Sequence, residues 1–561
     1  MSSPNLNYLW SSLIVEELIR NGVDYFCISP GSRSSPLVCA VADNPKAKTF
    51  VHFDERGTAF HALGYTSATG KPCVLICTSG TALANFFPAI IEASKKKLPL
   101  IILTADRPPE LRLTGANQTI DQIKIFGEYV RFFFDLPTPS QEIKPEFVLT
   151  TIDQAVFRSQ GELPGPVHLN CPFREPLAPV QMKGNFKFYL ESIKNWIKTG
   201  KPYTSYIRSE KKLNAKDTQM VCEILRNSQK GIIAVGKLSC PEDSKAIYQL
   251  AEKLNWPIFP DITSGLRLGC AHPNIISYFD QILMSANLVK IKTDCVLHLG
   301  GRLTSKRFYE YLPKNDPQNY IVVLNHPLRN DPLHKVSLRI QSKTEHFCKE
   351  IIKGIKSANK SHPFLKLLKD ENKKIDLKLE KMGDTPQLTE TIAVRLLSKL
   401  LPKDSGLFIA SSLPIREMDM VASPNANPVV VSSNRGASGI DGTIASSVGF
   451  AVGLNKPTTL LIGDLAFLHD LNSLAMLKNL HTPLVIVALN NNGGRLFSKL
   501  PIAEFKSYFE KFFLTPHNLR FEHAAQLFKI PYFAAKNLKE LTAAYQAAIK
   551  KHVSTLIEVV C

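Results

Sequence analysis

Two short polar motifs, each at the end of an apolar run, carry the clearest chemical potential in this chain. The run 460–462 ends in Gly463-Asp464, and the run 484–489 ends in Asn490-Asn491-Asn492-Gly493-Gly494. In a parallel α/β sheet, such strand ends meet at the carboxyl edge, where these sheets bind ligands. One carboxylate, one amide oxygen and a glycine-opened carbonyl suit Mg²⁺ held against a diphosphate. Asp, Asn and Gly are also typical of turns, so two ordinary buried strands ending in turns remain the alternative.

A second group of polar residues follows an apolar run near the start of the chain. The run 25–28 leads into Ser29-Pro-Gly-Ser32-Arg33, which offers hydroxyls, open backbone N–H groups and one guanidinium at a predicted helix start. Such a loop is a natural binding site for an anion. A plain Pro/Gly turn with a solvent-facing Arg33 is the alternative interpretation. Polar junctions at 54–57 and 78–81 occupy the same kind of position.

The apolar runs that precede these residues alternate with stretches of helical periodicity. Predicted strands at 49–53, 73–77 and 98–103 are each followed by a polar junction, and a closing strand covers 165–173. This pattern predicts a doubly wound, largely parallel domain, and similar alternation recurs twice later in the chain. We therefore expect an α/β protein of three doubly wound parallel-sheet domains, at 1–180, at 181–383 (a central domain with basic linkers) and at 384–561.

Local signals set more specific expectations for two regions. A first helix over 6–18 is expected to be capped by Ser3, with Pro4 in its first turn. Lysine is concentrated in 194–216 and 353–381, and both segments are expected to present solvated helix faces.

Composition limits the classes of protein to which the chain can belong. Its 561 residues, 44% hydrophobic and 21% charged, are typical of a globular protein with substantial cores. Eleven cysteines without a Cys-x-x-Cys pair favour reduced thiols in a cytoplasmic protein over a disulfide framework. We see neither a signal-peptide pattern at the start nor an apolar stretch long enough to span a bilayer.

The formal charge of +19 is compatible with nucleic acid, a membrane surface or anionic small molecules as partners. The lysine-rich segments lack the interleaved aromatic residues of a base-stacking surface. We therefore expect no nucleic-acid partner and no membrane partner, and we assign the charge to anionic small molecules.

Taken together, the motifs resemble those of thiamine-diphosphate-dependent enzymes. Gly463-Asp464 and Asn490-Asn491 match that family's cofactor motif, with the expected 27 positions from Asp464 to Asn491. Within that family the chain is similar to the 2-succinyl-5-enolpyruvyl-6-hydroxy-3-cyclohexene-1-carboxylate (SEPHCHC) synthases of menaquinone biosynthesis. The similarity is nearly full-length and strongest in the two outer domains. It rests on the segments 28–37, 53–56, 78–82, 103–111, 434–442 and 490–494.

The resemblance implies thiamine diphosphate as the cofactor, with Mg²⁺ or Mn²⁺. Glu55 matches the catalytic carboxyl that hydrogen-bonds N1′ of the aminopyrimidine, and its place directly after a strand expected to be buried suits a carboxyl shielded from water. Without the resemblance, Glu55 would be an acid stabilised at a helix N-terminus. The implied cofactor-binding residues are Ser412, Ala437, Ser438, Gly439, Ile440, Gly463 and Asp464, and the implied metal ligands are Asp464, Asn491 and Gly493.

The implied reaction joins 2-oxoglutarate to isochorismate with release of CO₂ and retention of the enolpyruvyl group, in a homodimer or a dimer of dimers. Both substrates carry two carboxylates, which is a direct reason for cations around the site. The implied substrate-binding residues are Ser32, Arg33, Arg107, Gln118, Lys306, Arg307, Arg416, Arg435, Leu496, Phe497 and Leu500. Lys306 and Arg307 lie in the least similar domain, where exposure to solvent is the default for such residues.

One residue departs from the family pattern, and two other functions stay open. Arg495 stands where the family has a small or polar residue, with Lys499 nearby; Arg495 either faces solvent or adds a cation to the acceptor pocket. Another thiamine-diphosphate enzyme acting on a 2-oxo acid, such as an acetolactate synthase or a decarboxylase, is the first alternative, and Asn434-Arg435-Gly436 argues against it. A non-catalytic basic binding protein is the second; intact Glu55 and Asp464 argue against that.

Overall fold

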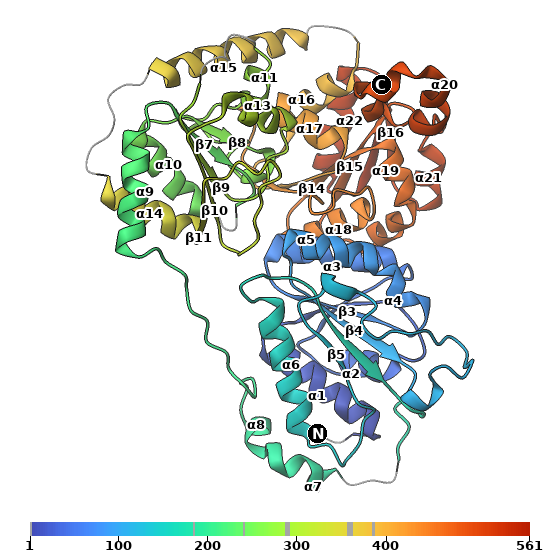
Figure 1. Ribbon diagram of the computed structural model, residues 1–561. Coiled ribbons are helices and arrows are strands. Elements are labelled where there is room, and N and C mark those ends of the chain that lie inside the picture. Colours follow the sequence, from blue (N-terminus) through green and yellow to red (C-terminus); the bar gives the residue numbers. More distant parts are fainter. Residues whose placement is uncertain (1–2, 183–185, 239–241, 286–291, 356–362, 384–386) are drawn as a thin grey trace. The chain divides into compact units, whose positions relative to one another are not determined.

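Three parallel β-sheets flanked by helices make up the chain in the computed structural model, which describes residues 3–182, 186–238, 242–285, 292–355, 363–383 and 387–561 (Figure 1). The predicted α/β class with three doubly wound parallel sheets is confirmed. The chain divides into two compact units. Unit 1 comprises 1–208, 434–455 and 466–484, and unit 2 comprises 209–433, 456–465 and 485–561.

The first sheet belongs to unit 1 and has helices on both faces (Figure 1). Its six strands run in the order β2-β1-β3-β4-β6-β5, and every neighbouring pair is parallel. The strands are β1 Tyr25–Ile28, β2 Lys48–Val51, β3 Cys73–Cys77, β4 Leu100–Asp106, β5 Phe133–Asp135 and β6 Val167–Pro172. The helices are α1 Leu6–Arg20, α2 Ser35–Ala42 and α6 Pro145–Ser159 on one face, and α3 Glu55–Thr69, α4 Thr81–Asn85 and α5 Phe87–Lys96 elsewhere in the domain.

One local prediction for this domain was wrong, and one strand was missed. Asn5, not Ser3, caps α1, since its side chain accepts the N–H of Tyr8 at 3.0 Å. β6 is the last strand of the sheet in chain order, as predicted, but the short strand β5, which the sequence pattern did not reveal, pairs on its far side.

A helix from late in the chain packs closely on α3 within unit 1. This helix, α18 (Thr443–Leu454), approaches through glycines on both partners. A Cβ on Gly64 would lie 1.9 Å from the carbonyl oxygen of Ser446, and a Cβ on Gly449 would lie 1.9 Å from that of His61. Only glycine permits backbones to approach so closely. The segment that precedes α18, which holds several predicted cofactor residues, is thereby anchored to unit 1.

The second sheet, in unit 2, has the order β11-β10-β9-β7-β8, with all pairs parallel. At its strand-order reversal, the loops after β7 and β9 touch, because a Cβ on Gly236 would lie 1.8 Å from the carbonyl oxygen of Gly301. The elements are β7 Gly231–Val235, β8 Ile258–Pro260, β9 Cys295–Leu299, β10 Asn319–Leu324, β11 Leu338–Gln341, α9 Ala215–Asn227, α10 Glu242–Leu254, α11 Phe279–Ile282, α13 Lys306–Asn315, α14 Thr344–Gly354 and α15 Pro363–Met382.

The third sheet, also in unit 2, has the order β13-β12-β14-β15-β17-β16. Helices α16, α17 and α22 share a hydrophobic core with it. The elements are β12 Gly406–Ile409, β13 Val430–Ser432, β14 Thr458–Gly463, β15 Leu484–Asn490, β16 Tyr532–Ala535, β17 Thr555–Val560, α16 Glu390–Leu400, α17 Leu413–Val421, α19 Asp464–His469, α20 Lys506–Phe509, α21 Glu522–Leu527 and α22 Leu538–Lys551.

The lysine-rich segments behave differently from one another. Residues 194–216 are helical only at their ends, in α8 (Lys194–Lys198) and the start of α9, so the expected helix face there was wrong. The second segment forms the long helix α15, and residues 356–362 of it lie outside the described residues. Among the described residues, no helix has the length and apolar character needed to span a bilayer.

Candidate functional site

The predicted residues of the first domain gather where the strand order of its sheet reverses. β1 lies between β2 and β3, so the loops after β1 and β3 border a crevice at the carboxyl edge. A Cβ on Gly31 would lie 2.2 Å from the Cβ of Thr78, so the first loop needs glycine to pass the second. The Thr78 hydroxyl accepts the backbone N–H of Arg33 at 3.2 Å. The two sequence motifs therefore form one structure.

Two of the predicted arginines interact at this crevice. Arg33 is 8% exposed, its Nη1 donates to the carbonyl of Phe173 at 3.0 Å, and its buried Nε has no partner among the described residues. Burial and the like charge of Arg107 lower the pKa of the Arg33 guanidinium. Nη1 of Arg33 also lies 3.3 Å from Oε1 of Glu175, whose side chain is 69% exposed. The like charge of Arg107 and the unsatisfied buried donor favour a further bound anion.

A serine that the sequence reasoning missed joins Arg107 to Gln118. The hydroxyl of Ser79 accepts a hydrogen bond from Nη1 of Arg107 and donates to the carbonyl of Gln118 at 3.1 Å. In return, Nε2 of Gln118 donates to the carbonyl of Ser79 at 3.0 Å. Ser32 lies exposed on the neighbouring loop. The structure therefore brings together all four predicted substrate-binding residues of this domain.

Glu55 is the first residue of α3, and Asp54 caps that helix by accepting the N–H of Gly57 at 3.3 Å. The expectation that a buried strand precedes Glu55 was wrong. β2 is an edge strand whose residues are mostly exposed: its last residue, Val51, is 60% exposed, and Phe53 just after it is 63% exposed. β2 therefore does not supply the shielding from water that the sequence predicted for Glu55, which is half-buried.

The predicted cofactor turn before α18 is held by Glu92 of α5. Oε1 of Glu92 accepts the N–H of Gly436 at 2.7 Å, and Oε2 accepts those of Ala437 at 2.6 Å and Ser438 at 3.4 Å. Glu92 is buried, so these charge-assisted bonds form a backbone nest around its carboxylate. Ala437, Ser438 and Gly439 remain exposed, with Arg435 and Ile440 half-buried beside them. Sequence reasoning missed Glu92 because nothing in its helix marks a contact 344 residues away.

The other predicted cofactor residues border the equivalent reversal in the third sheet. β12 lies between β13 and β14, so Ser412 follows one strand of this crevice, and Gly463 and Asp464 end the other. Ser412 has φ 75° and ψ −130°, a sparsely populated conformation that starts α17. Backbone strain of this kind clusters at functional sites. One turn later, Nη1 of Arg416 donates to the carbonyl of Ser412.

The ends of β14 and β15 meet as the sequence predicted. Asp464 is buried, and its Oδ2 accepts the N–H of Gly493 at 2.8 Å. Gly493 has φ 127°, and a Cβ there would lie 2.2 Å from the carbonyl oxygen of Leu514, so only glycine fits. Asn491 donates through Nδ2 to Glu390, and its buried Oδ1 has no partner among the described residues.

Three family models match successive parts of the chain. They are described as the N-terminal TPP binding domain of thiamine pyrophosphate enzymes (residues 10–125), the middle domain of thiamine pyrophosphate (187–409) and the C-terminal TPP binding domain of these enzymes (422–559). Curated relatives named SEPHCHC synthase align with the whole chain. The one from Rubrobacter xylanophilus is 44% identical, and the one from Chlorobium phaeobacteroides is 43% identical, with 96% of each relative covered. The chain belongs to the SEPHCHC synthase family.

A solved structure supports the same fold for this synthase family member. The chain aligns with the crystal structure of benzoylformate decarboxylase from Polynucleobacter necessarius over 98% of each chain, with a TM-score of 0.74 and 15% identity. At that identity, the likeness concerns the fold alone. The predicted family and its cofactor, thiamine diphosphate, are confirmed by the three family models and the curated relatives.

The oxygens at the third sheet fit a divalent metal held against the diphosphate of that cofactor. Oδ1 of Asn491 is buried and meets no donor from the described residues, and Oδ1 of Asp464 accepts the N–H of Leu465 at 2.6 Å and keeps a second lone pair. The carbonyl of Gly493 accepts the N–H of Arg495 at 2.9 Å and also keeps a lone pair. Hard oxygens of this kind, completed by phosphate oxygens, are what Mg²⁺ prefers.

The remaining predicted substrate residues are distributed unevenly. Leu496, Phe497 and Leu500 follow residues 490–494, the predicted metal loop. The first two lie within a short 3-10 helix, Arg495–Lys499. Lys306 pairs with Glu310 of its own helix, is 81% exposed at its side chain and therefore remains solvated. Arg307 pairs with Asp280 and touches the sulfur of Met420 at the end of α17.

Arg495, the departure from the family pattern, folds back on its own loop. Its Nε donates to the carbonyl of Asn491 at 3.0 Å while the residue stays exposed. The side chain therefore braces the metal loop, and Lys499 lies 3.9 Å from Oε1 of Glu417.

Glu417 was missing from the predicted site. It follows Arg416, is 2% exposed, and its Oε2 has no partner among the described residues. Burial and the neighbouring Glu390 carboxyl raise the pKa of Glu417 to about 7. A carboxyl of this kind holds a proton near neutral pH. Glu417 directly follows the predicted residue Arg416, but nothing in the sequence indicates that its side chain is buried.

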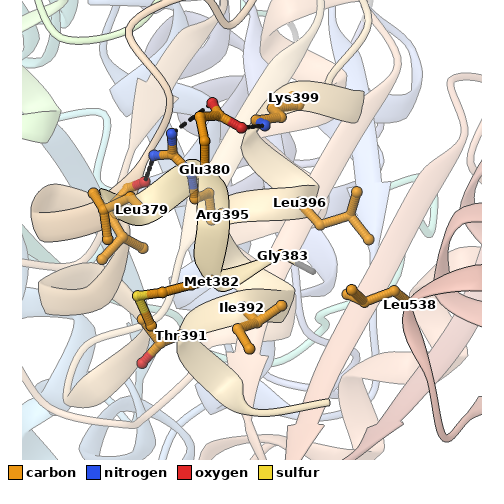
Figure 2. A pocket seen from close by; sticks show the side chains of 11 residues that line it. Leu379, Glu380, Met382, Gly383, Thr391, Ile392, Arg395, Leu396, Lys399 and Leu538 are labelled. Atoms are coloured by element: carbon orange, nitrogen blue, oxygen red, sulfur yellow. Dashed lines mark hydrogen bonds and ion pairs between the residues drawn. The ribbon is translucent and has the colours of Figure 1, made fainter. Parts of the chain in front are cut away.

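A cavity of about 270 Å³ opens elsewhere in unit 2 and contains no predicted site residue (Figure 2). Its charged groups pair with one another, because Glu380 binds both Arg395 and Lys399. The lining residues are Leu379, Glu380, Met382, Gly383, Thr391, Ile392, Arg395, Leu396, Lys399, Val421 and Leu538.

Proposed function

We propose that this chain decarboxylates 2-oxoglutarate with thiamine diphosphate and adds the resulting succinyl unit to isochorismate in a 1,4 sense, giving SEPHCHC and CO₂. The observation that carries this substrate choice is the pair Arg33 and Arg107 at the crevice of the first sheet. Both substrates are dicarboxylates, and an anion there supplies the acceptor that Nε of Arg33 lacks. Gln118, held by Ser79, offers a neutral polar contact beside the cations.

Thiamine diphosphate, when bound, supplies the electron sink for loss of CO₂. The chain's own residues bind and orient. Glu55 is proposed to hold a proton at N1′ of the aminopyrimidine, while Ser412 and residues 437–440 position the cofactor. Arg416 and Arg435 are proposed to bind substrate carboxylates, and Leu496, Phe497 and Leu500 to form an apolar wall that excludes water. Lys306 and Arg307 have weaker support, because Lys306 is largely exposed and Arg307 pairs with the buried Asp280.

Asp464, Asn491 and the carbonyl of Gly493 are proposed to hold Mg²⁺ or Mn²⁺. Following the resemblance, we propose a homodimer or a dimer of dimers in which each cofactor site uses the first domain of one subunit and the third domain of its partner. We also propose a cytoplasmic location, with no nucleic-acid or membrane partner.

Purified protein incubated with thiamine diphosphate, Mg²⁺, 2-oxoglutarate and isochorismate tests the proposal. We expect CO₂ release and a succinylated product that retains the enolpyruvyl group, detected by mass spectrometry. Preferential use of pyruvate without isochorismate would instead support an acetolactate-type or decarboxylase activity. Absence of turnover with every 2-oxo acid, while charged ligands still bind, would support a non-catalytic binding protein.

A further inference from the structure

The side-chain amide of Asn491 can adopt two orientations related by a flip, and its contact with Glu390 favours one of them. A carboxylate only accepts hydrogen bonds, so the amide turns Nδ2 toward Oε1 of Glu390. Oδ1 is then left buried, with no partner in the part of the chain that the structure describes. Glu390 comes from the start of α16, 101 residues from Asn491. Without this acceptor, nothing in the contact fixes the orientation of the amide.

Asp464 is oriented in a comparable way by His517. Nδ1 of His517 accepts the N–H of Leu519 at 3.0 Å, so the ring proton lies on Nε2, which donates to Oδ2 of Asp464 at 3.1 Å. Together with the N–H of Gly493, this donor occupies both lone pairs of Oδ2. Oδ1 of Asp464 is the oxygen that keeps capacity for another ligand.

The loop that carries His517 is itself tied to the metal loop. Oδ1 of Asn492 accepts the N–H of His517 at 3.1 Å and that of Asn518 at 2.7 Å. The imidazole is 10% exposed at its side chain, so it is shielded from water. His517 is therefore held by the loop that carries Asn491, while it donates to Asp464 at the end of β14.

We propose that Glu390 and His517 are positioning residues for the metal: Glu390 aims Oδ1 of Asn491, and His517 aims Oδ1 of Asp464, at one divalent cation. This inference rests on the proposed metal site and adds two residues to it. Side chains that orient metal ligands typically contribute 10- to 100-fold to metal affinity or activity. The two contacts act on different ligands and are separable by mutation.

The test measures the Mn²⁺ concentration that gives half-maximal binding of thiamine diphosphate to the full-length protein, by isothermal titration. Glu390→Gln is expected to raise this concentration by roughly tenfold, because a Gln accepts or donates and no longer selects one amide orientation. His517→Phe is expected to raise it by a similar factor, and His517→Gln, which keeps a donor, to recover part of the loss. The matched controls Glu522→Gln and His523→Phe, both exposed and outside this cluster, should not change it.

A second background separates orientation from general structural support. In Asn491→Asp both ends of the side chain are oxygens, and the Glu390 carboxylate then repels it. Adding Glu390→Gln should therefore strengthen metal-dependent binding in that background, opposite to its effect in the unmodified chain. A merely structural role predicts weakening in both backgrounds.

The outcomes distinguish this inference from the function on which it rests. If the unmodified protein binds thiamine diphosphate equally well without a divalent metal, the proposed metal site is wrong. If binding depends on metal but Glu390→Gln and His517→Phe leave it within twofold, the positioning role is wrong. Glu390→Gln and His517→Phe act on different ligands, so should one of them fail to fold, as judged by circular dichroism, the other still tests the positioning role.

Discussion

Two buried polar atoms that lack a partner among the described residues carry much of the functional argument at the scale of single residues. Nε of Arg33 is a donor, and Oδ1 of Asn491 is an acceptor. Leaving such a group buried and unsatisfied costs on the order of 1–3 kcal/mol. In the proposed function, a substrate carboxylate would accept from Arg33 and a divalent cation would bind Asn491. The opposite character of the two atoms therefore suits the two different groups that we propose for these positions.

Glu55→Gln tests the proton-holding role at the same scale. Gln keeps the size of the side chain but cannot share a proton with N1′, so we expect turnover to fall by roughly 10²–10⁴-fold, the usual contribution of acid–base groups. Cofactor affinity should change little, because the diphosphate end lies with Asp464 and Asn491. Steady-state rates and titration of thiamine diphosphate measure the two quantities separately. Full activity in this variant would exclude the assigned role.

A single site residue could be predicted only where its role is marked by the sequence immediately around it. Arg33, Asp464 and Asn491 were found because each lies directly after an apolar strand, where chain order alone places it at the sheet edge. Ser79, Glu92 and His517 were missed, although all three hold predicted site residues. Their roles depend on contacts 28, 345 and 53 residues away, which no local pattern encodes.

At the scale of elements, long apolar strands were predicted well, whereas two short edge strands, β5 and β16, were missed. β3 occupies the predicted residues 73–77, and β14 and β15 end where expected. β5 has three residues and β16 has four, which is too short for an alternating pattern to stand out. The burial of β2 was predicted wrongly, because an apolar edge strand has the same sequence pattern as a central one.

The contact between α5 and the cofactor turn gives a prediction at this scale. Glu92→Ala removes the acceptor of three backbone N–H groups and is expected to lower the free energy of unfolding by about 1–3 kcal/mol. We expect weaker binding of thiamine diphosphate as well, since residues 437–439 lose their anchor. Denaturant titration and cofactor titration measure these effects. Glu110→Ala, which breaks an exposed pair with Arg174, is the control, and an equal loss of stability there would contradict the argument.

The extended segment after α8 is attached to α1 through Glu17, and this attachment predicts a pH dependence. Oε2 of Glu17 accepts Nε1 of Trp196 at 2.6 Å, and Oε1 accepts the N–H of Tyr203 at 2.6 Å. Burial and a hydrogen bond with Asp153 raise the pKa of Glu17 to about 8. In the unfolded chain this carboxyl titrates near 4.3, so the folded form binds the extra proton between these values. Its stabilising contribution is fully present below pH ~4.3 and is lost as pH rises through about 8.

Hydrogen exchange at the amides of Tyr203 and Thr204 follows this attachment directly. Protection in the unmodified protein should fall between pH 5 and pH 8.5, after correction for the intrinsic exchange rate. In Glu17→Gln the side chain does not titrate, so the corrected protection should vary less with pH. Parallel profiles in the two proteins would show that Glu17 does not control the segment.

At the scale of the whole molecule, the number and class of the sheets could be predicted from the sequence, but their grouping with later segments could not. Residues 434–455 belong to the same compact unit as the first sheet, because α18 packs on α3 through Gly64 and Gly449. Those glycines have no distinguishing neighbours in the sequence. The closeness of two helix backbones depends on both partners at once, so it becomes visible only when the helices are seen together.

The net charge of +19 gives a prediction for the molecule as a whole. A positive protein attracts dicarboxylate substrates over distances comparable to the Debye length, which shrinks from about 30 Å at 0.01 M salt to about 3 Å at 1 M. We expect kcat/KM for 2-oxoglutarate to fall by roughly tenfold across this range, with most of the change in KM. Steady-state kinetics in NaCl measures this, and sucrose at matched viscosity is the control. Salt-independent KM, or an equal fall in sucrose, would mean that the charge serves another purpose than substrate capture.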